Sequence, residues 1–141
     1  MKNLIPIILF LFCNYSYSLS INEVKIVGEE IENCSLSRES VDASLSSVAR
    51  YNRINIKATG NVTIYHQVNA LPVQSNFCAV NLHLDFRVHD YVRVKDKNIF
   101  TTIQLCSQSY MLTGIISGLQ TRLNDAAKQA FELCLVEIEK K

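Results

Sequence analysis

The sequence predicts an α+β domain in which an N-terminal helix and a long C-terminal helix cover one face of an antiparallel β-meander of three to four strands. Three features lead to this class: apolar residues at helical spacing around Leu45, two-residue alternation through the middle of the chain, and a long helical spacing up to the carboxyl end. Strands that alternate apolar and polar residues bury one face only. We therefore expect both helices to pack on the same side of the sheet and the other side to be exposed to solvent.

A secretory signal peptide opens the chain. A short basic start precedes an apolar run at residues 4–13, and small residues favour cleavage after Ser18. The run is too short for a membrane span, which needs about 20 apolar residues. A lipoprotein cut before Cys13 is disfavoured, because a bulky residue precedes it. We therefore assign residues 1–18 to the signal peptide and residues 19–141 to a single domain.

The charge balance limits the class of partner. The processed chain, without Lys2, has 13 basic and 13 acidic residues, so its formal net charge is zero. A neutral chain has no overall field that draws it to nucleic acid or to an anionic membrane surface. We expect no nucleic-acid partner and no stable membrane insertion after removal of the signal peptide.

Four cysteines remain after cleavage, an even number that predicts two disulfides in an exported chain. They are Cys34, Cys78, Cys106 and Cys134. Zinc sites use closely spaced pairs, whereas the gaps here are 44, 28 and 28 residues, so we expect no metal and no cofactor. Four cysteines allow three pairings. A first helix that runs back along the next strand favours Cys34 with Cys78, and Cys106 with Cys134.

The first half of the domain predicts a strand, a helix and a second strand. Residues 21–31 indicate a short edge strand, and residues 36–52 carry apolar side chains at helical spacing after a capping Ser37. Alternation resumes at residues 54–68, where Gly60 indicates a bulge or a close backbone approach. A polar loop that contains a proline then ends this strand.

The second half predicts a hairpin and a long helix. Residues 77–95 form a strand long enough to require twist or a bulge, which we place at Asp90 because this carboxylate falls on the apolar side. Residues 95–98 make a polar turn, and residues 99–106 return as the partner strand. From Leu112 to the end, apolar residues recur every three or four positions, which predicts a helix.

The predicted solvent-exposed face of the long strand carries the candidate binding residues. His83, Asp85 and His89 suggest a metal site, but the two histidines lie about 20 Å apart on a straight strand, too far to share one ion. The basic and aromatic residues form a better patch for an anionic partner, since tyrosine and arginine are typical interface anchors. The alternative is an ordinary solvated sheet face. We predict binding at Arg87, Tyr91, Arg93 and Lys95.

The sequence contains no signature of catalysis. There is no GxSxG or HExxH motif and no phosphate-binding loop, and all four remaining cysteines are assigned to disulfides. His66 falls on the buried side of its strand, where a lone histidine is usually a core residue. We therefore expect a protein that is not an enzyme. Sequons at Asn33 and Asn61 allow glycosylation only in a eukaryotic secretory route.

One segment resembles a known family. The helix VDASLSSVARYN at residues 41–52, followed by a strand, is similar to the helix and first strand of cystatins, secreted inhibitors of cysteine proteases. The resemblance covers roughly 20 residues and implies a protease inhibitor. The counterpart of the family's Gln-x-Val-x-Gly hairpin is QVNAL at residues 67–71, which lacks the glycine, and the cysteines are placed differently.

These features together predict a small exported, non-enzymatic binding or assembly module that acts through protein–protein contacts, at its sheet face or at the loop with Pro72. We expect a cell-envelope accessory protein in the periplasm if the source is bacterial, or an extracellular protein if it is eukaryotic. Its partner is then another envelope or extracellular protein. Two alternatives stay open: a secreted carrier of a small molecule or lipid in an apolar pocket, and a cystatin-like protease inhibitor.

Overall fold

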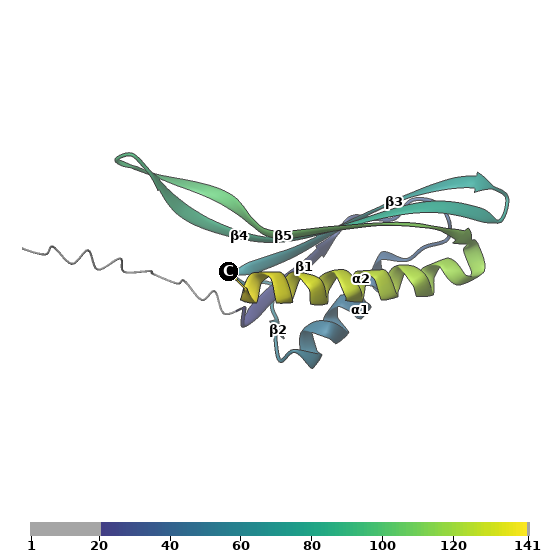
Figure 1. Ribbon diagram of the computed structural model, residues 1–141, viewed down its shortest axis with the longest axis horizontal. Coiled ribbons are helices and arrows are strands. Elements are labelled where there is room, and N and C mark those ends of the chain that lie inside the picture. Colours follow the sequence, from purple (N-terminus) through teal and green to yellow (C-terminus); the bar gives the residue numbers. More distant parts are fainter. Residues whose placement is uncertain (1–20, 141) are drawn as a thin grey trace, which may run out of the picture.

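The computed structural model describes residues 21–140, so the predicted signal peptide at residues 1–18 lies outside the described part of the chain. Two helices cover one face of a five-stranded sheet and the opposite face is open, which is the predicted α+β arrangement (Figure 1). In chain order the elements are β1 (Glu23–Gly28), α1 (Arg38–Tyr51), β2 (Asn55–Ile56), β3 (Val62–Gln74), β4 (Phe77–Val94), β5 (Lys97–Ile115) and α2 (Ile116–Glu139).

The order of strands in the sheet is β2-β1-β3-β4-β5. The last three strands form the predicted antiparallel meander. β1 is added parallel to β3, and the two-residue β2 pairs with the outer side of β1. A parallel pair needs a crossover connection, and α1 supplies it on the covered face. β1 therefore lies one strand inside the edge position predicted for it.

The position of α1 follows from its cap and its apolar stripe. The side chain of Ser37 accepts a hydrogen bond from the Ser40 N–H at 3.1 Å, which satisfies one of the free donors of the first turn. Val41, Leu45 and Val48 are buried in the core. Each such side chain contributes about 1.5 to 3 kcal/mol relative to an exposed position, so this stripe holds α1 against the sheet.

The chain after α1 approaches β1 closely at Gly60. The predicted single strand is divided here into β2 and β3, and in the connecting turn the Lys57 N–H donates to the Val24 carbonyl at 2.9 Å. A Cβ on Gly60 would lie 2.4 Å from the carbonyl carbon of Val24, so a side chain does not fit. The close backbone approach predicted from this glycine is confirmed.

The loop predicted around Pro72 is shorter than expected. β3 continues to Gln74, and the chain turns into β4 at residues 75–76. The register between β3 and β4 shifts between Pro72 and Gln74. A proline is tolerated at such an irregularity, because one ladder hydrogen bond is already missing there.

β4 and β5 are the longest strands, and one bulge interrupts their pairing. The register shifts between Phe86 and Arg87, where β5 accommodates one extra residue, Leu105. The irregularity predicted at Asp90 is wrong, because Asp90 pairs regularly with Thr101. Asp90 lies where neither face of the strand pair is covered, so its carboxylate is solvated without a break in the ladder.

α2 begins at Ile116, later than the apolar spacing from Leu112 suggests. Leu112 and Gly114 belong instead to β5, where they pair with Val80 and Cys78 of β4. Ladder hydrogen bonds to a neighbouring strand outweigh a helical spacing that contains glycine, a weak helix former. Within residues 21–140, no helix is both long and apolar enough to cross a membrane.

Two disulfides join the elements in the favoured pairing. Cys34, in the loop before α1, is bonded to Cys78 near the start of β4, with the Cα atoms 6.3 Å apart. Cys106 of β5 is bonded to Cys134 of α2, with the Cα atoms 5.5 Å apart. The second bridge closes because β5 and α2 run in opposite directions over equal lengths: nine steps of strand and eighteen steps of helix each span about 30 Å.

The core lies between the helices and the sheet. Phe86 of β4 and Phe131 of α2 meet edge to face, with ring centroids 5.1 Å apart, and both are fully buried. Such an aromatic pair adds about 0.5 to 1.5 kcal/mol to the stabilisation that burial provides. Ile64 of β3 and Leu123 of α2 are buried as well, so the described residues pack around one core.

Candidate functional site

The four predicted binding residues do not lie together. Tyr91, Arg93 and Lys95 are exposed near the far end of the β4–β5 hairpin. Arg87 lies within the sheet, and its guanidinium donates a hydrogen bond to the Asp85 carboxylate. Arg87 is therefore engaged in the fold, whereas the other three residues belong to a separate surface.

The far end of this hairpin projects beyond the other described elements (Figure 1). β3 pairs with β4 only as far as Val88, so residues 89–102 form a two-stranded ribbon that no other described strand joins. We call residues 89–102 the arm. The chain turns at Lys95 and Asp96, and every residue from 89 to 100 is exposed. An isolated two-stranded ribbon is only marginally stable in water.

Both faces of the arm carry large apolar side chains. On one face Tyr91 and Phe100 pair across the strands with ring centroids 5.0 Å apart, and the imidazole of His89 stacks on Phe100 at 6.1 Å. Val92 and Ile99 pair on the opposite face. Tyr91 is 67% exposed and Phe100 is 59% exposed. Large apolar side chains that are exposed together mark interaction surfaces.

A charged network occupies the middle of the open sheet face. Asp85 is only 1% exposed, although it lies on the face away from the helices. Its Oδ2 accepts from Arg87, and its Oδ1 lies 3.0 Å from Nε2 of His83. The guanidinium of Arg87 lies 4.6 Å from the ring centroid of Tyr65 on β3. These neighbouring side chains screen Asp85 from water.

Opposing effects act on the pKa of Asp85. Burial raises this pKa, because the carboxylate loses hydration. Hydrogen bonds from Arg87 and Ser107, together with the charges of His83 and Arg87, outweigh burial and hold the pKa below its usual range. Asp85 is thus ionised at neutral pH and orients the side chains around it.

A serine, a histidine and an aspartate follow one another across this face, in the order found in hydrolytic triads. Oγ of Ser109 lies 2.7 Å from Nδ1 of His83, and the other ring nitrogen faces Asp85. The row lies on the open sheet face, and none of its three residues lines the hollow beside Cys34 and Cys78 or the hollow beside Glu29 and Glu32. We interpret the row as cross-strand bonding that stiffens the sheet.

A second apolar surface lies on the open face, at the end of the sheet opposite the arm. It consists of Leu71 of β3, Phe77 of β4, and Met111 and Ile115 of β5, which the register places on neighbouring rows. Met111 is 79% exposed and Leu71 is 67% exposed. We call these four residues the open-face patch. The sequence does not reveal it, because its members lie on three strands and only the register brings them together.

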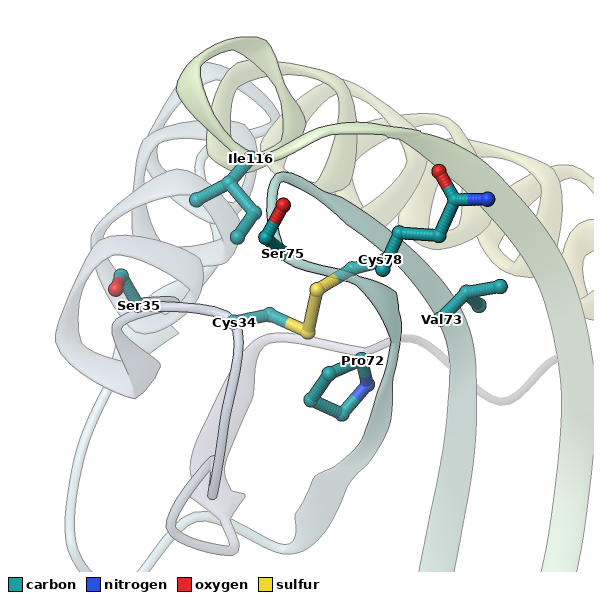
Figure 2. A pocket seen from close by; sticks show the side chains of 8 residues that line it. Cys34, Ser35, Pro72, Val73, Ser75, Cys78 and Ile116 are labelled. Atoms are coloured by element: carbon teal, nitrogen blue, oxygen red, sulfur yellow. A yellow bond between two sulfur atoms is a disulfide. The ribbon is translucent and has the colours of Figure 1, made fainter.

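Figure 2 shows a hollow beside the disulfide between Cys34 and Cys78. Its volume is about 460 Å³, within the range of small-ligand sites. Pro72 and Val73 of β3 and Ile116 of α2 supply the apolar part of its lining. This hollow lies at the end of the sheet and is open to solvent, so it is a surface cleft and not a cavity enclosed beneath the helices.

A smaller hollow of about 280 Å³ lies between β3 and the segment that follows β1. Its lining includes Glu29, Glu30 and Glu32. Glu29 accepts from Nε2 of Gln67 at 3.0 Å, and Glu30 pairs with Nη1 of Arg38 at 2.9 Å, so two of these carboxylates are engaged in the fold. Among residues 21–140, no group of three His, Cys, Asp or Glu side chains is placed to hold a metal ion.

His66 is fully buried, as the sequence predicts, and connects β3 to α1. Its Nε2 lies 2.5 Å from Oδ1 of Asp42, whose other oxygen is 3.7 Å from Nε of Arg38. A Cβ on Gly28 would lie 2.2 Å from the imidazole, so the ring fills the space that the glycine leaves. His66 is therefore a core residue that fastens the sheet to the helix.

The cystatin-like segment has a different setting from the family's inhibitory hairpin. Residues 67–71 lie inside β3 and pair with residues 79–83 of β4. They are part of a continuous strand and not a turn, so they form no projecting loop of the kind that a hairpin inhibitor inserts.

No protein-family model and no curated protein matches the chain. Several solved structures are similar to it, including the following two. A minor lipoprotein from Acinetobacter baumannii has a TM-score of 0.39 and 10% identity, over 85% of this chain and 95% of that one. The hypothetical protein CT253 from Chlamydia trachomatis has a TM-score of 0.40 and 8% identity, over 85% of this chain and 96% of that one. At this level of similarity the two likenesses carry no argument about function.

Proposed function

We propose that the chain is a small exported binding module without enzymatic activity, which docks onto another protein of the cell envelope or extracellular space through its arm. The observation that carries this proposal is a projecting ribbon with large apolar side chains exposed on both faces. When a partner removes apolar surface from water, the free energy of the system falls, which favours the complex. The arm has no such cover within the described chain.

The two disulfides support export. Together they use every cysteine of residues 21–140. Disulfides of this kind form and persist in oxidising compartments and are rare in the cytosol. The compartment is the periplasm if the source is bacterial, and the extracellular space if it is eukaryotic.

The arm offers a partner both side-chain anchors and free backbone. Tyr91 and Phe100 supply aromatic area, which is typical of the centre of an interface, and Arg93 and Lys95 supply positive charge for its rim. Beyond Val88 no described strand pairs with the outer side of β4, so a strand of the partner can be added there. The surface that matches the arm is an apolar groove bordered by acidic side chains.

Site-directed crosslinking in the native host tests this proposal. A photo-crosslinking amino acid at Tyr91 should give one defined adduct. The same amino acid at Tyr51, which is 85% exposed at the end of α1, should give none and is the matched control. Equal crosslinking from both positions would move the site away from the arm.

A surface variant tests the same interaction with purified protein. The triple variant Tyr91→Ser, Arg93→Ser and Phe100→Ser should bind the crosslinked partner at least tenfold more weakly while its far-ultraviolet circular dichroism stays unchanged. The control variant Tyr51→Ser with Arg53→Ser removes a tyrosine and an arginine from another exposed surface and should bind normally. Undiminished binding by the triple variant contradicts a role for the arm.

The hollow beside Cys34 and Cys78 favours a second candidate, a carrier of a small molecule. Its volume suits a small ligand, and its lining is largely apolar. Native mass spectrometry of protein purified from the native host would then show a bound species. Val73→Trp should fill the hollow and release that species, and a ligand-free wild-type protein would remove this candidate.

A further inference from the structure

The two edges of the sheet are unequally protected. At one edge, β2 has only two residues, and β1 behind it carries an ion pair between Glu23 and Lys57. At the other edge, β5 has 19 residues, of which only Lys97 is charged and none is proline. Proteins guard edge strands by shortness, charge or proline, because free N–H and C=O groups pair with other strands. β5 lacks these protections over most of its length.

One contact identifies the backbone groups that face outward from β5. Nη1 of Arg122 donates to the carbonyl oxygen of Thr113 at 2.6 Å, so this oxygen is turned away from β4. Alternate residues of an antiparallel pair face the partner strand, and therefore Ser109 and Met111 present their backbone groups at the same outer edge as Thr113. Arg122 covers this edge at Thr113. Residues 107–111 lie between this contact and the bulge at Leu105, and no described strand pairs with their outer side.

We propose that a second copy of this chain pairs with residues 107–111 of β5, antiparallel and about a twofold axis at Ser109. Met111 of one copy then lies opposite Ser107 of the other. The stretch contains no charged residue, so the strand meets itself without like-charge repulsion. A twofold axis joins the same stretch of both copies, so each β5 edge occupies the other, and β2 is too short to receive a further β5; the pair therefore closes as a dimer.

The same pairing covers apolar side chains on α2. Leu133 and Val136 are 43% and 46% exposed. Leu133 and Val136 follow Arg122 by 11 and 14 residues. At 3.6 residues per turn, each points within about 40° of the direction of Arg122 around the helix axis, so the three residues share one flank of α2. Arg122 reaches the outer edge of β5, so this flank faces the second copy. The dimer therefore sets the two α2 helices side by side and removes both side chains from water.

Pairing at β5 also brings the two open-face patches onto one surface. Met111 is 79% exposed and lies two residues from the axis, so the patches of the two copies lie on the same face of the joined sheet, on either side of the Ser109 pair. Together they occupy six strands, β3, β4 and β5 of each copy. This inference is independent of the proposed docking of the arm, which lies at the opposite end of the sheet.

Met111→Pro tests the dimer directly. Proline removes the outward N–H of residue 111 and leaves the bonds to β4 intact, because this N–H is turned away from β4. Processed wild-type protein should sediment with twice the mass of one chain at high micromolar concentration and dissociate on dilution. Met111→Pro should keep the mass of one chain throughout, and Met111→Val, which retains the N–H, should behave as the wild type does.

Hydrogen exchange of the wild type supplies a second readout that needs no variant. The amide of Ser109 should exchange at least tenfold more slowly in the concentrated sample than in the dilute one, whereas the amide of Lys25 in β1 should exchange equally in both. Circular dichroism establishes whether Met111→Pro is folded, and if it is not, the wild-type exchange decides. A wild type that keeps the mass of one chain at all these concentrations, or a folded Met111→Pro that dimerises normally, overturns the proposal.

Discussion

Gly28 leaves room for the imidazole of His66, which is fully buried and bonded to Asp42 of α1. A methyl group at Gly28 would lie 2.2 Å from two atoms of this ring, and the bond to Asp42 holds the ring in place. We expect Gly28→Ala to lower the free energy of unfolding by about 1 to 3 kcal/mol, the usual cost of overpacking. Urea denaturation of the variant and the wild type measures this difference.

The control for this prediction removes the imidazole. In a His66→Ala background the added methyl group contacts no imidazole ring. Gly28→Ala should therefore lower the free energy of unfolding much less there than it does in the wild type. An equal cost in both backgrounds would show that Gly28 is needed for a reason other than space for His66.

Asp85 links the stability of the fold to pH. Its pKa lies below the usual range, because bonds from Arg87 and Ser107 outweigh burial, so its ionised form stabilises the folded state at neutral pH. This contribution is complete above the unfolded-state pKa and is lost as the pH falls below about 4 toward the folded-state pKa. We expect Asp85→Asn to cost about 1 to 3 kcal/mol at neutral pH and to show a shallower loss of stability in acid.

Denaturation curves at neutral pH and at acid pH check this expectation. Asp90→Asn is the matched control, because Asp90 lies on the exposed arm. That variant should lose stability in acid as steeply as the wild type does. If Asp85→Asn follows the wild type as well, the acid dependence belongs to other carboxylates.

At the scale of elements, the arm and the sheet that carries it differ in packing. Residues 82–86 of β4 alternate between the core and a screened open face, whereas residues 89–100 are exposed on both sides. Local opening of a region that buries little surface costs much less than global unfolding. We expect the amides of residues 89–100 to exchange roughly a hundredfold faster than those of residues 82–86. Exchange monitored by nuclear magnetic resonance measures both sets in one sample.

Equal protection in the two segments would contradict this picture of a solvated arm. Addition of the protein that the proposed crosslinking identifies supplies the corresponding positive test of the proposed docking. Protection should then rise in the arm and stay unchanged in residues 82–86, because only the arm passes from solvent into an interface.

Elements whose signals are local could be predicted from the sequence. The cap at Ser37 and the helical spacing behind it define α1, and alternation on both sides of a short polar turn defines the β4–β5 hairpin. The start of α2 at Ile116 could not be predicted, because pairing with β4 keeps Leu112 in a strand against its own spacing. The parallel placement of β1 depends in the same way on a neighbour that is distant in the sequence.

The molecule as a whole is cross-linked at both ends of its helical layer, by one disulfide before α1 and one in the last turns of α2. Removal of the bond between Cys106 and Cys134 frees a loop of 28 residues. We expect the double variant Cys106→Ala with Cys134→Ala to lose about 3 to 4 kcal/mol, chiefly because its unfolded chain is less restricted.

Thermal unfolding under non-reducing conditions measures that loss. The wild type and the variant should converge when both are fully reduced, because the bond that distinguishes them is then gone. A wild-type protein that reacts with a thiol reagent under denaturing conditions would show instead that the bonds are absent in the native host.

The candidate site could be predicted only in part, for a reason that belongs to the whole sheet. The sequence indicates Tyr91, Arg93 and Lys95 from their residue types, but the engagement of Arg87 depends on Asp85 and on its neighbours across the sheet. The arm exists because β3 has 13 residues and β4 has 18, so the β4–β5 hairpin extends past the point where β3 stops pairing with β4. That mismatch is visible only when the strands are set in register.

The disulfide between Cys106 and Cys134 restricts how relatives of this chain can vary in size. It closes only if β5 and α2 cover the same distance from the turn that joins them. A strand advances about twice as far per residue as a helix, and two residues must be gained together to keep each side chain on its face. Insertions are therefore tolerated in coupled sets, two residues in each of β4 and β5 with about four in α2. An insertion in one element alone would pull the two sulfur atoms out of reach.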